Sequence, residues 1–253
     1  MRNIAPTGAL QRRAREFLQG ALLFVGFSAF ALFFSIFLAA VKLAPPSTSS
    51  YEVYTFITNA LFIAGIISGL IGLALGLRAR TWKTDNDLAR IVGDVLGRSL
   101  GDEYTFIRNV SRFHVTPGYR LGYIDAVLVG PPGALVFRIL DEQGLFLNEV
   151  DRWLKADQNN EWMPAGIDPT RQCAVDIIAL RTFLEAHKFQ DVPVYGVVAF
   201  THEAPRVELT LKDPQVPATQ ASGILPRLQN SYFAKQRVDK ELVATLVKLL
   251  CPN

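Results

Sequence analysis

The chain has 253 residues, half of them hydrophobic, and a formal net charge of +3. Five of its 26 basic and two of its 23 acidic residues lie in residues 1–77, so residues 78–253 carry 21 of each sign. This formally neutral segment has no run of basic residues, which disfavours a domain built to bind nucleic acid through its phosphates.

Two long uncharged segments near the N-terminus predict membrane-spanning helices. Residues 17–41 and residues 55–77 contain no charged side chain. As a helix the first run would be about 37 Å long, enough for a hydrocarbon core of about 30 Å. Both runs are longer than the apolar core of a signal peptide. The predicted divisions are a segment 1–16, a first span 17–42, a loop 43–54, a second span 55–77 and a soluble domain 78–253.

The basic residues around the spans predict their orientation. Only Lys42 lies next to the connecting loop, whereas seven basic residues flank the other ends of the spans: Arg2, Arg12, Arg13, Arg15, Arg78, Arg80 and Lys83. Positive charge favours the cytoplasmic side. We therefore expect a protein of the inner or plasma membrane, with both termini and the soluble domain in the cytoplasm and the loop outside.

The second span carries a stripe of glycines. Gly65, Gly69, Gly72 and Gly76 recur at intervals of four, three and four residues, which lets another helix backbone approach closely. The partner is either the first span or a helix of another subunit. Neither span contains Asp, Glu, Lys, Arg or His, which argues against a transporter, a proton channel or a redox carrier.

Helical and strand-like patterns alternate in the soluble domain. Thr84 and Asp87 resemble a capping box that begins an amphipathic helix reaching Leu100. Asp168 and Pro169 begin a long helix that ends near His187. Strands are predicted at residues 104–114, 121–129, 134–140, 145–150, 194–201 and 206–211, and further helices near residues 222–228 and 239–250. This order predicts an α/β domain in which helices flank a mixed sheet.

Two charged residues interrupt apolar strands of this domain. If residues 130–133 form a four-residue hairpin loop, Val129 opposes Ala134 and Asp125 opposes Arg138. An unpaired charge among apolar neighbours is costly. The two side chains therefore form a cross-strand ion pair, or Asp125 belongs to a metal site.

The motifs around these residues resemble the nuclease-related domain, NERD, of the PD-(D/E)xK nuclease-like class. The resemblance covers about residues 84–200. It is carried by Tyr123–Pro131, Gly133–Phe137, Gly144, the region of Trp153 and Trp162, and Asp168–Gln172. The resemblance implies a restriction-endonuclease-like fold for the soluble domain.

The resemblance also implies a catalytic site that this sequence only partly retains. In such nucleases an Asp at the position of Asp125 and a Glu at that of Arg138 bind Mg²⁺, and a Lys at that of Leu140 orients the attacking water. Asp125 and the helix-opening Gln172 are present, whereas the Glu and the Lys are not. Gln172 is either a member of the site or a surface or capping residue.

Arg138 cannot replace the missing metal ligand, and two nearby acids are candidates to do so. Arg138 supplies no oxygen ligand, and at about 5 Å and an effective dielectric constant of about 20 it would oppose Mg²⁺ by roughly 7 kcal/mol, an upper-end figure. Asp141 or Glu142 could substitute for the lost acid, although a solvated turn also explains both. The upstream helical Glu of the family falls on Ala89, with Asp87 nearby.

Two functions follow from this reading. The first is a catalytically inactive NERD-like scaffold or interaction module, such as an accessory subunit of a membrane complex. It needs no cofactor, and its partners are the bilayer and other membrane subunits or a second copy. The alternative is a membrane-tethered nuclease that uses Mg²⁺, or a nucleic-acid-binding module.

The remaining candidates for chemistry carry no recognisable motif. The histidines His114, His187 and His202 belong to no ligand cluster and are expected to have no catalytic role. Cys173 and Cys251 have no metal-ligand spacing and are expected to be small core residues.

Overall fold

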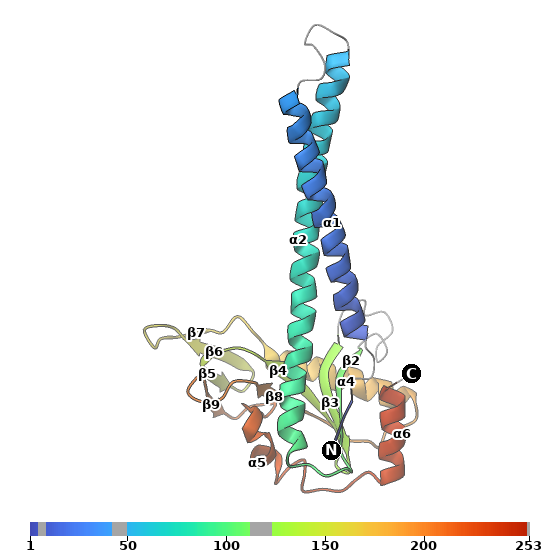
Figure 1. Cartoon of the computed structure of the whole chain (residues 1–253). Helices are drawn as coiled ribbons and strands as arrows, with labels where there is room; N and C mark the ends of the chain where they lie inside the picture. Colours follow the sequence, from blue (N-terminus) through green and yellow to red (C-terminus); the bar gives the residue numbers. More distant parts are fainter. Residues whose placement is uncertain (5–8, 42–49, 112–122, 252–253) are drawn as a thin grey trace. The chain divides into compact units, whose positions relative to one another are not determined.

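A computed structural model describes residues 1–4, 9–41, 50–111 and 123–251 (Figure 1). The chain divides into two compact units, one of Gly8–Thr84 and one of Met1–Thr7 together with Asp85–Asn253. His114 and residues 43–49 of the predicted loop lie outside the described residues, whereas residues 50–54 of that loop are helical.

The first unit is a helical hairpin of α1 (Ala9–Val41) and the part of α2 (Ser50–Gly97) that precedes Asp85 (Figure 1). Arg15–Val41 and Ser50–Arg80 are long and apolar enough to cross a membrane. Serine hydroxyls join the two helices: Ser28 Oγ donates to the Gly65 carbonyl at 2.7 Å, and Ser68 Oγ donates to the Phe24 carbonyl at 2.8 Å.

The prediction that a new helix begins at Thr84 is wrong. α2 is continuous through Thr84, and the predicted amphipathic helix is its C-terminal part. Residues 77–92 contain no glycine and no proline, so nothing in the sequence ends the preceding helix before the amphipathic pattern begins. The pattern of Thr84 and Asp87 that resembles a capping box therefore lies inside a continuous helix.

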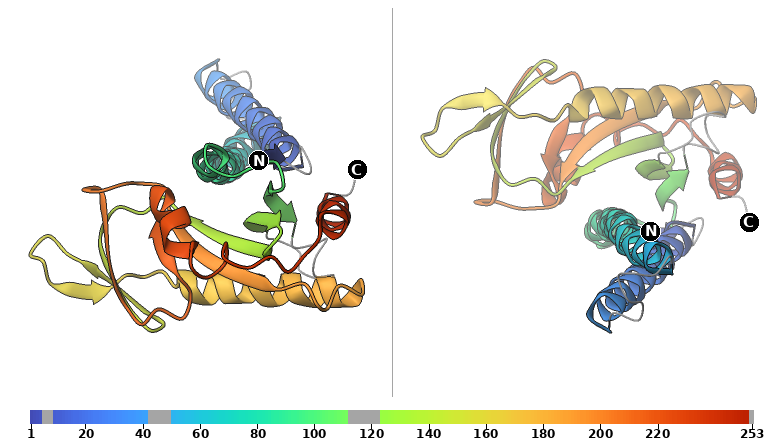
Figure 2. Two further views of the ribbon diagram at one scale, coloured as in Figure 1. Left: turned by 90° about the horizontal axis from the view of Figure 1, so that it is seen from below. Right: turned by 90° about the horizontal axis from the view of Figure 1, so that it is seen from above.

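The second unit is built on a six-stranded mixed sheet in the order β1-β2-β3-β4-β8-β10 (Figure 2). β3 is antiparallel to both β2 and β4. β1 is parallel to β2, β8 is parallel to β4, and β10 is parallel to β8. The strands are β1 Arg2–Ile4, β2 Thr105–Ser111, β3 Tyr123–Gly130, β4 Gly133–Leu140, β8 Val194–Phe200 and β10 Ala218–Gln220. The mixed sheet is confirmed, but β1 and β10 were not predicted.

The other four strands form a separate sheet in the order β7-β6-β5-β9. They are β5 Gly144–Glu149, β6 Arg152–Ala156, β7 Trp162–Pro164 and β9 Val207–Lys212. β6 and β7 form an antiparallel pair that carries Trp153 and Trp162, the two tryptophans of the family resemblance. The division into two sheets was not predicted, because the spacing of apolar residues predicts strands but not their partners.

Helices cover both faces of the six-stranded sheet. α4 (Pro169–Ala186) contacts β4 and β8, and α6 (Lys240–Leu250) contacts β2 and β3, so these two helices enclose one apolar core (Figure 2). The C-terminal part of α2 and α5 (Ile224–Leu228), which follows η1 (Ala221–Gly223), enclose another core on the opposite face. The flanking helices predicted from sequence are therefore present.

The start of α4 follows from its sequence. Asp168 Oδ1 accepts the N–H of Arg171 at 2.9 Å, and Pro169 occupies the first helical turn. A side-chain cap and a proline in this turn are both favourable, because they satisfy or remove N–H groups that lack partners within the helix. The predicted N-terminus of the helix is confirmed.

Candidate functional site

The register of β3 and β4 determines which side chains meet. Val129 pairs with Ala134, as predicted, but Gly130 also pairs with Gly133, so the hairpin loop has two residues, Pro131 and Pro132, and not the predicted four. The backbone pairing of the two strands ends at Ala126. At the next residue of β3, a side chain replaces the backbone as hydrogen-bond acceptor: Asp125 Oδ2 accepts the N–H of Ile139 at 2.7 Å.

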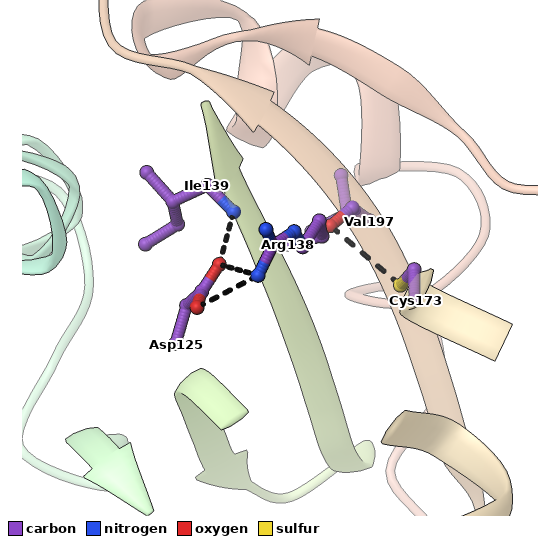
Figure 3. Close-up of polar contacts among 5 residues, drawn as sticks. All are labelled: Asp125, Arg138, Ile139, Cys173 and Val197. Atoms are coloured by element: carbon purple, nitrogen blue, oxygen red, sulfur yellow. Dashed lines mark hydrogen bonds and ion pairs between the residues drawn. The ribbon is translucent and has the colours of Figure 1, made fainter. Parts of the chain in front are cut away.

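Asp125 also forms the predicted ion pair with Arg138. Arg138 Nη1 lies 3.1 Å from Asp125 Oδ1 and 3.2 Å from Oδ2 (Figure 3). The Asp125 side chain is 10% exposed and that of Arg138 27% exposed. Both carboxylate oxygens thus accept hydrogen bonds in a nearly buried position, where an ionised carboxylate needs such partners.

The positions that the family resemblance assigned to a Lys and to an upstream Glu are apolar and lie in different cores. Leu140 is 8% exposed and packs in the core beneath α4 and α6. Ala89 is fully buried in the core on the opposite face of the sheet. Asp87, near Ala89 in sequence, is half-buried on α2. The structure therefore does not bring these three positions together.

Gln172 lies on the exposed side of the first turn of α4. Its backbone N–H donates to the Asp168 carbonyl at 3.2 Å. The buried side of the same helix carries a residue that sequence reasoning missed, Asp176, which has no exposed surface. Asp176 lies among Cys173, Leu180 and other apolar residues at helical spacing, and a charge on such a stripe was the signal that could have identified it.

Cys173 lies on the same buried side of α4 and has a weak contact from Sγ to the Val197 carbonyl at 3.9 Å (Figure 3). Burial, followed by the nearby carboxylate of Asp176, raises the pKa of Cys173 to about 12, and Arg138 has a smaller opposing effect. Because the thiolate is the nucleophilic form, this cysteine remains protonated and unreactive. It is a small core residue, as predicted, whereas Cys251 is half-buried.

Asp141 and Glu142 lie in a solvated turn, as one of the two readings predicted. Asp141 Oδ1 accepts from Thr201 Oγ1 at 2.9 Å and pairs with His202 Nε2 at 3.0 Å. Glu142 Oε2 is 4.0 Å from Lys155 Nζ. Among the described residues, no three His, Cys, Asp or Glu side chains are grouped so that they could hold a metal ion.

The glycine stripe of α2 faces α1. A Cβ atom built on Gly65 would lie 2.8 Å from Leu32 Cγ, and one on Gly72 would lie 2.8 Å from Val25 Cγ2. At Gly69 the nearest atom is the hydroxyl oxygen of Ser28, at 2.9 Å, whereas Gly76 is looser, with its nearest atom at 3.9 Å. Of the two partners considered for this stripe, the first span is the one in contact with it.

Residues 85–201 match the family model described as the nuclease-related domain, NERD. These residues form a NERD domain. No curated protein and no solved structure matches the chain. The family resemblance is thereby confirmed, as is its fold class of two long apolar helices followed by a mixed sheet with flanking helices.

The residues of this NERD domain do not fit the Mg²⁺ ion that the nuclease-like class implies. A hard cation requires several oxygen ligands. Asp125 contributes two oxygens that already accept hydrogen bonds from Arg138 and Ile139, and Leu140 contributes none. The guanidinium group supplies a positive charge where the cation would bind.

Proposed function

We propose that this protein is a membrane-anchored NERD domain that does not cleave phosphodiesters and acts instead as a scaffold or interaction module, such as an accessory subunit of a membrane complex. The observation that carries the proposal is the position of the Arg138 guanidinium on the Asp125 carboxylate. A cation could bind Asp125 only by displacing the Arg138 guanidinium, which is hydrogen-bonded to the carboxylate and is itself positively charged.

The chemistry of hydrolysis supports this assignment. Metal-assisted phosphodiester cleavage needs a cation to polarise the phosphate and to activate water. Here the carboxylate that would hold the cation is neutralised by Arg138, and the buried Leu140 can neither donate a proton nor orient water. The surrounding fold stabilises the ion pair, because Ile139 fixes the same carboxylate from the backbone.

The pairing of the N-terminal strand supports a hairpin anchor. β1 precedes both long helices in the chain, yet it pairs with β2 of the domain that follows them. A chain that leaves this domain, forms two membrane spans and returns to it must enter and leave the bilayer on one side. Together with the excess of basic residues outside the connecting loop, this favours a cytoplasmic domain.

A second candidate function is nucleic-acid binding or cleavage, which the family description itself favours. The equal numbers of basic and acidic residues in residues 78–253 oppose it, because phosphate contacts supply most of such affinity. Retention on DNA or RNA that weakens as the salt concentration rises would support this candidate. The absence of retention at low ionic strength would exclude it.

The test of the proposal is a cleavage assay on the purified full-length protein with single-stranded DNA, double-stranded DNA and RNA, in the presence of Mg²⁺ or Mn²⁺. We expect no metal-dependent cleavage by the wild-type protein. Metal-dependent cleavage that disappears in Asp125→Ala but persists in Glu208→Ala would overturn the proposal. Glu208, exposed on β9, is the control acid because, unlike Asp141 and Glu142, it is not a candidate replacement ligand.

A further inference from the structure

α2 exposes a second stripe, separate from its glycines, with alternating spacings of three and four residues. The apolar members range from 44% to 73% exposed. The stripe consists of Phe56, Asn59, Ile63, Ile66, Leu70, Leu73 and Leu77. Large residues at this spacing form the contact seam between helices that pack side by side in a coiled coil.

Asn59 is the one polar member of this stripe, and it lies about one turn inside the predicted second span. Its side chain is exposed, and no hydrogen bond from it to the described residues is present. Its neighbour Thr58 behaves differently, because Thr58 Oγ1 donates to the Tyr54 carbonyl at 2.9 Å within the same helix. In hydrocarbon, an amide without a partner is costly.

The serines between α1 and α2, unlike Asn59, have hydrogen-bond partners within the hairpin. Ser28 and Ser68 lie between the helices and bond to backbone carbonyls of the opposite helix. Ser35 Oγ likewise donates to the Thr58 carbonyl at 2.9 Å. The polar groups between α1 and α2 are thus satisfied within the hairpin, while the amide of Asn59 lies on an outer face of α2.

We propose that this stripe, the Asn59 seam, binds the Asn59 seam of a second copy of the chain, with the two Asn59 amides hydrogen-bonded to each other. The proposal rests on the membrane anchoring proposed above. The partner of the membrane anchor is then an identical α2 helix, and the contact is a hydrogen-bonded pair of Asn59 amides within an otherwise apolar seam.

Two arguments favour a second copy over a different protein. Copies of one chain insert with the same orientation, so their α2 helices are parallel and Asn59 meets Asn59 at the same depth. A primary amide is both donor and acceptor, so two identical amides satisfy each other without a third group. Polar side chains that bond across membrane helices promote association in this way.

The experiment measures association of the full-length protein in phospholipid vesicles, by energy transfer between differently labelled copies at increasing dilution in lipid. The variants are Asn59→Leu, which removes the amide, and Asn59→Gln, which retains it. We expect Asn59→Leu to weaken the association constant by about 3- to 30-fold and Asn59→Gln to remain near the wild-type value. Equal association of wild type and Asn59→Leu would overturn the proposal.

A second readout tests the geometry of the Asn59 seam. In a chain with Cys251→Ser, Ile66→Cys should form an intermolecular disulfide on mild oxidation. Ile67→Cys should form much less, because Ile67 is exposed to a similar degree but lies outside the seam. Equal cross-linking at both positions would contradict the seam.

Resistance of each variant to alkaline extraction from the vesicles is measured in parallel. Loss of the wild-type protein from the membrane would refute the anchor, and with it the seam. Retention in the membrane without association would refute the Asn59 seam alone.

Discussion

At the scale of single residues, Asp125 acts as a structural anion. Its carboxylate replaces a backbone partner at the point where β3 and β4 stop pairing, and it fixes the side chain of Arg138. Removal of a charge from water costs several kcal/mol unless the group is paired and hydrogen-bonded. The Arg138 side chain is 27% exposed, which lowers the cost of its desolvation, although its buried Nε has no hydrogen-bond partner among the described residues.

The ion pair predicts strong coupling between two substitutions. Asp125→Ala and Arg138→Leu should each destabilise the protein by about 1–3 kcal/mol, because each leaves the other charge with fewer partners. The double variant should lose less than the sum by about 1 kcal/mol or more. Thermal unfolding of the four full-length proteins in detergent measures this difference. Additivity within about 0.5 kcal/mol would show that the pair contributes no coupling.

The ion pair could be predicted from sequence, whereas for Asp176 the apolar stripe of α4 indicates only a buried side of the helix and not what that side packs against. A short hairpin loop fixes the register of two strands, so the position of Asp125 opposite Arg138 follows from counting residues. Asp176 lies on α4, and its burial depends on how that helix packs on β4 and β8. That packing involves residues far apart in sequence, which no local pattern specifies.

At the scale of elements, the N-terminal strand is the largest departure from the sequence prediction. β1 has three residues, and its sequence Arg-Asn-Ile shows no alternation over the length that identifies a strand. The sequence therefore predicts only a cytosolic N-terminal segment of residues 1–16, with no strand assigned within it. The strand forms because β2 offers an open edge and because Gly93 of α2 leaves room for Asn3.

Gly93 should be intolerant of alanine although alanine favours helices by about 1 kcal/mol. A Cβ atom at this position would lie 2.6 Å from Asn3 Nδ2 and 2.9 Å from Phe106 Cδ1. Phe106 is fully buried and packs edge-on against Phe137, so it cannot move away cheaply. Overpacking of this kind costs about 1–3 kcal/mol. We expect Gly93→Ala to lower the melting temperature by several degrees.

Gly97 provides the matched control for this substitution. It lies one turn further along α2, is exposed, and would place a Cβ atom 3.5 Å from its nearest neighbour, Met1 Cε. Gly97→Ala should leave the melting temperature unchanged or raise it slightly. A lower melting temperature for Gly97→Ala than for Gly93→Ala would contradict the close packing of β1, α2 and β2.

At the scale of the whole molecule, the chain leaves the second unit after β1 and returns to it at Asp85. Between these points lie the two segments long enough to cross a membrane. If both segments cross the membrane, the chain has two spans. The second unit then lies on one side of the membrane and the loop that connects the two helices lies on the other. This constraint places both ends of the hairpin on one side of the membrane without saying which side, and the distribution of basic residues alone favours the cytoplasm for it.

The orientation predicts the labelling of cysteines by a maleimide that cannot cross membranes. In a chain with Cys251→Ser, the buried Cys173 should remain unlabelled. Ser50→Cys, at the start of α2, should react in intact cells, whereas Asn160→Cys, in the exposed turn between β6 and β7, should react only after permeabilisation. Permeabilised cells, in which both should react, control for accessibility. Labelling of both positions in intact cells would place the NERD domain outside, and labelling of neither would show that α2 does not begin at the outer surface.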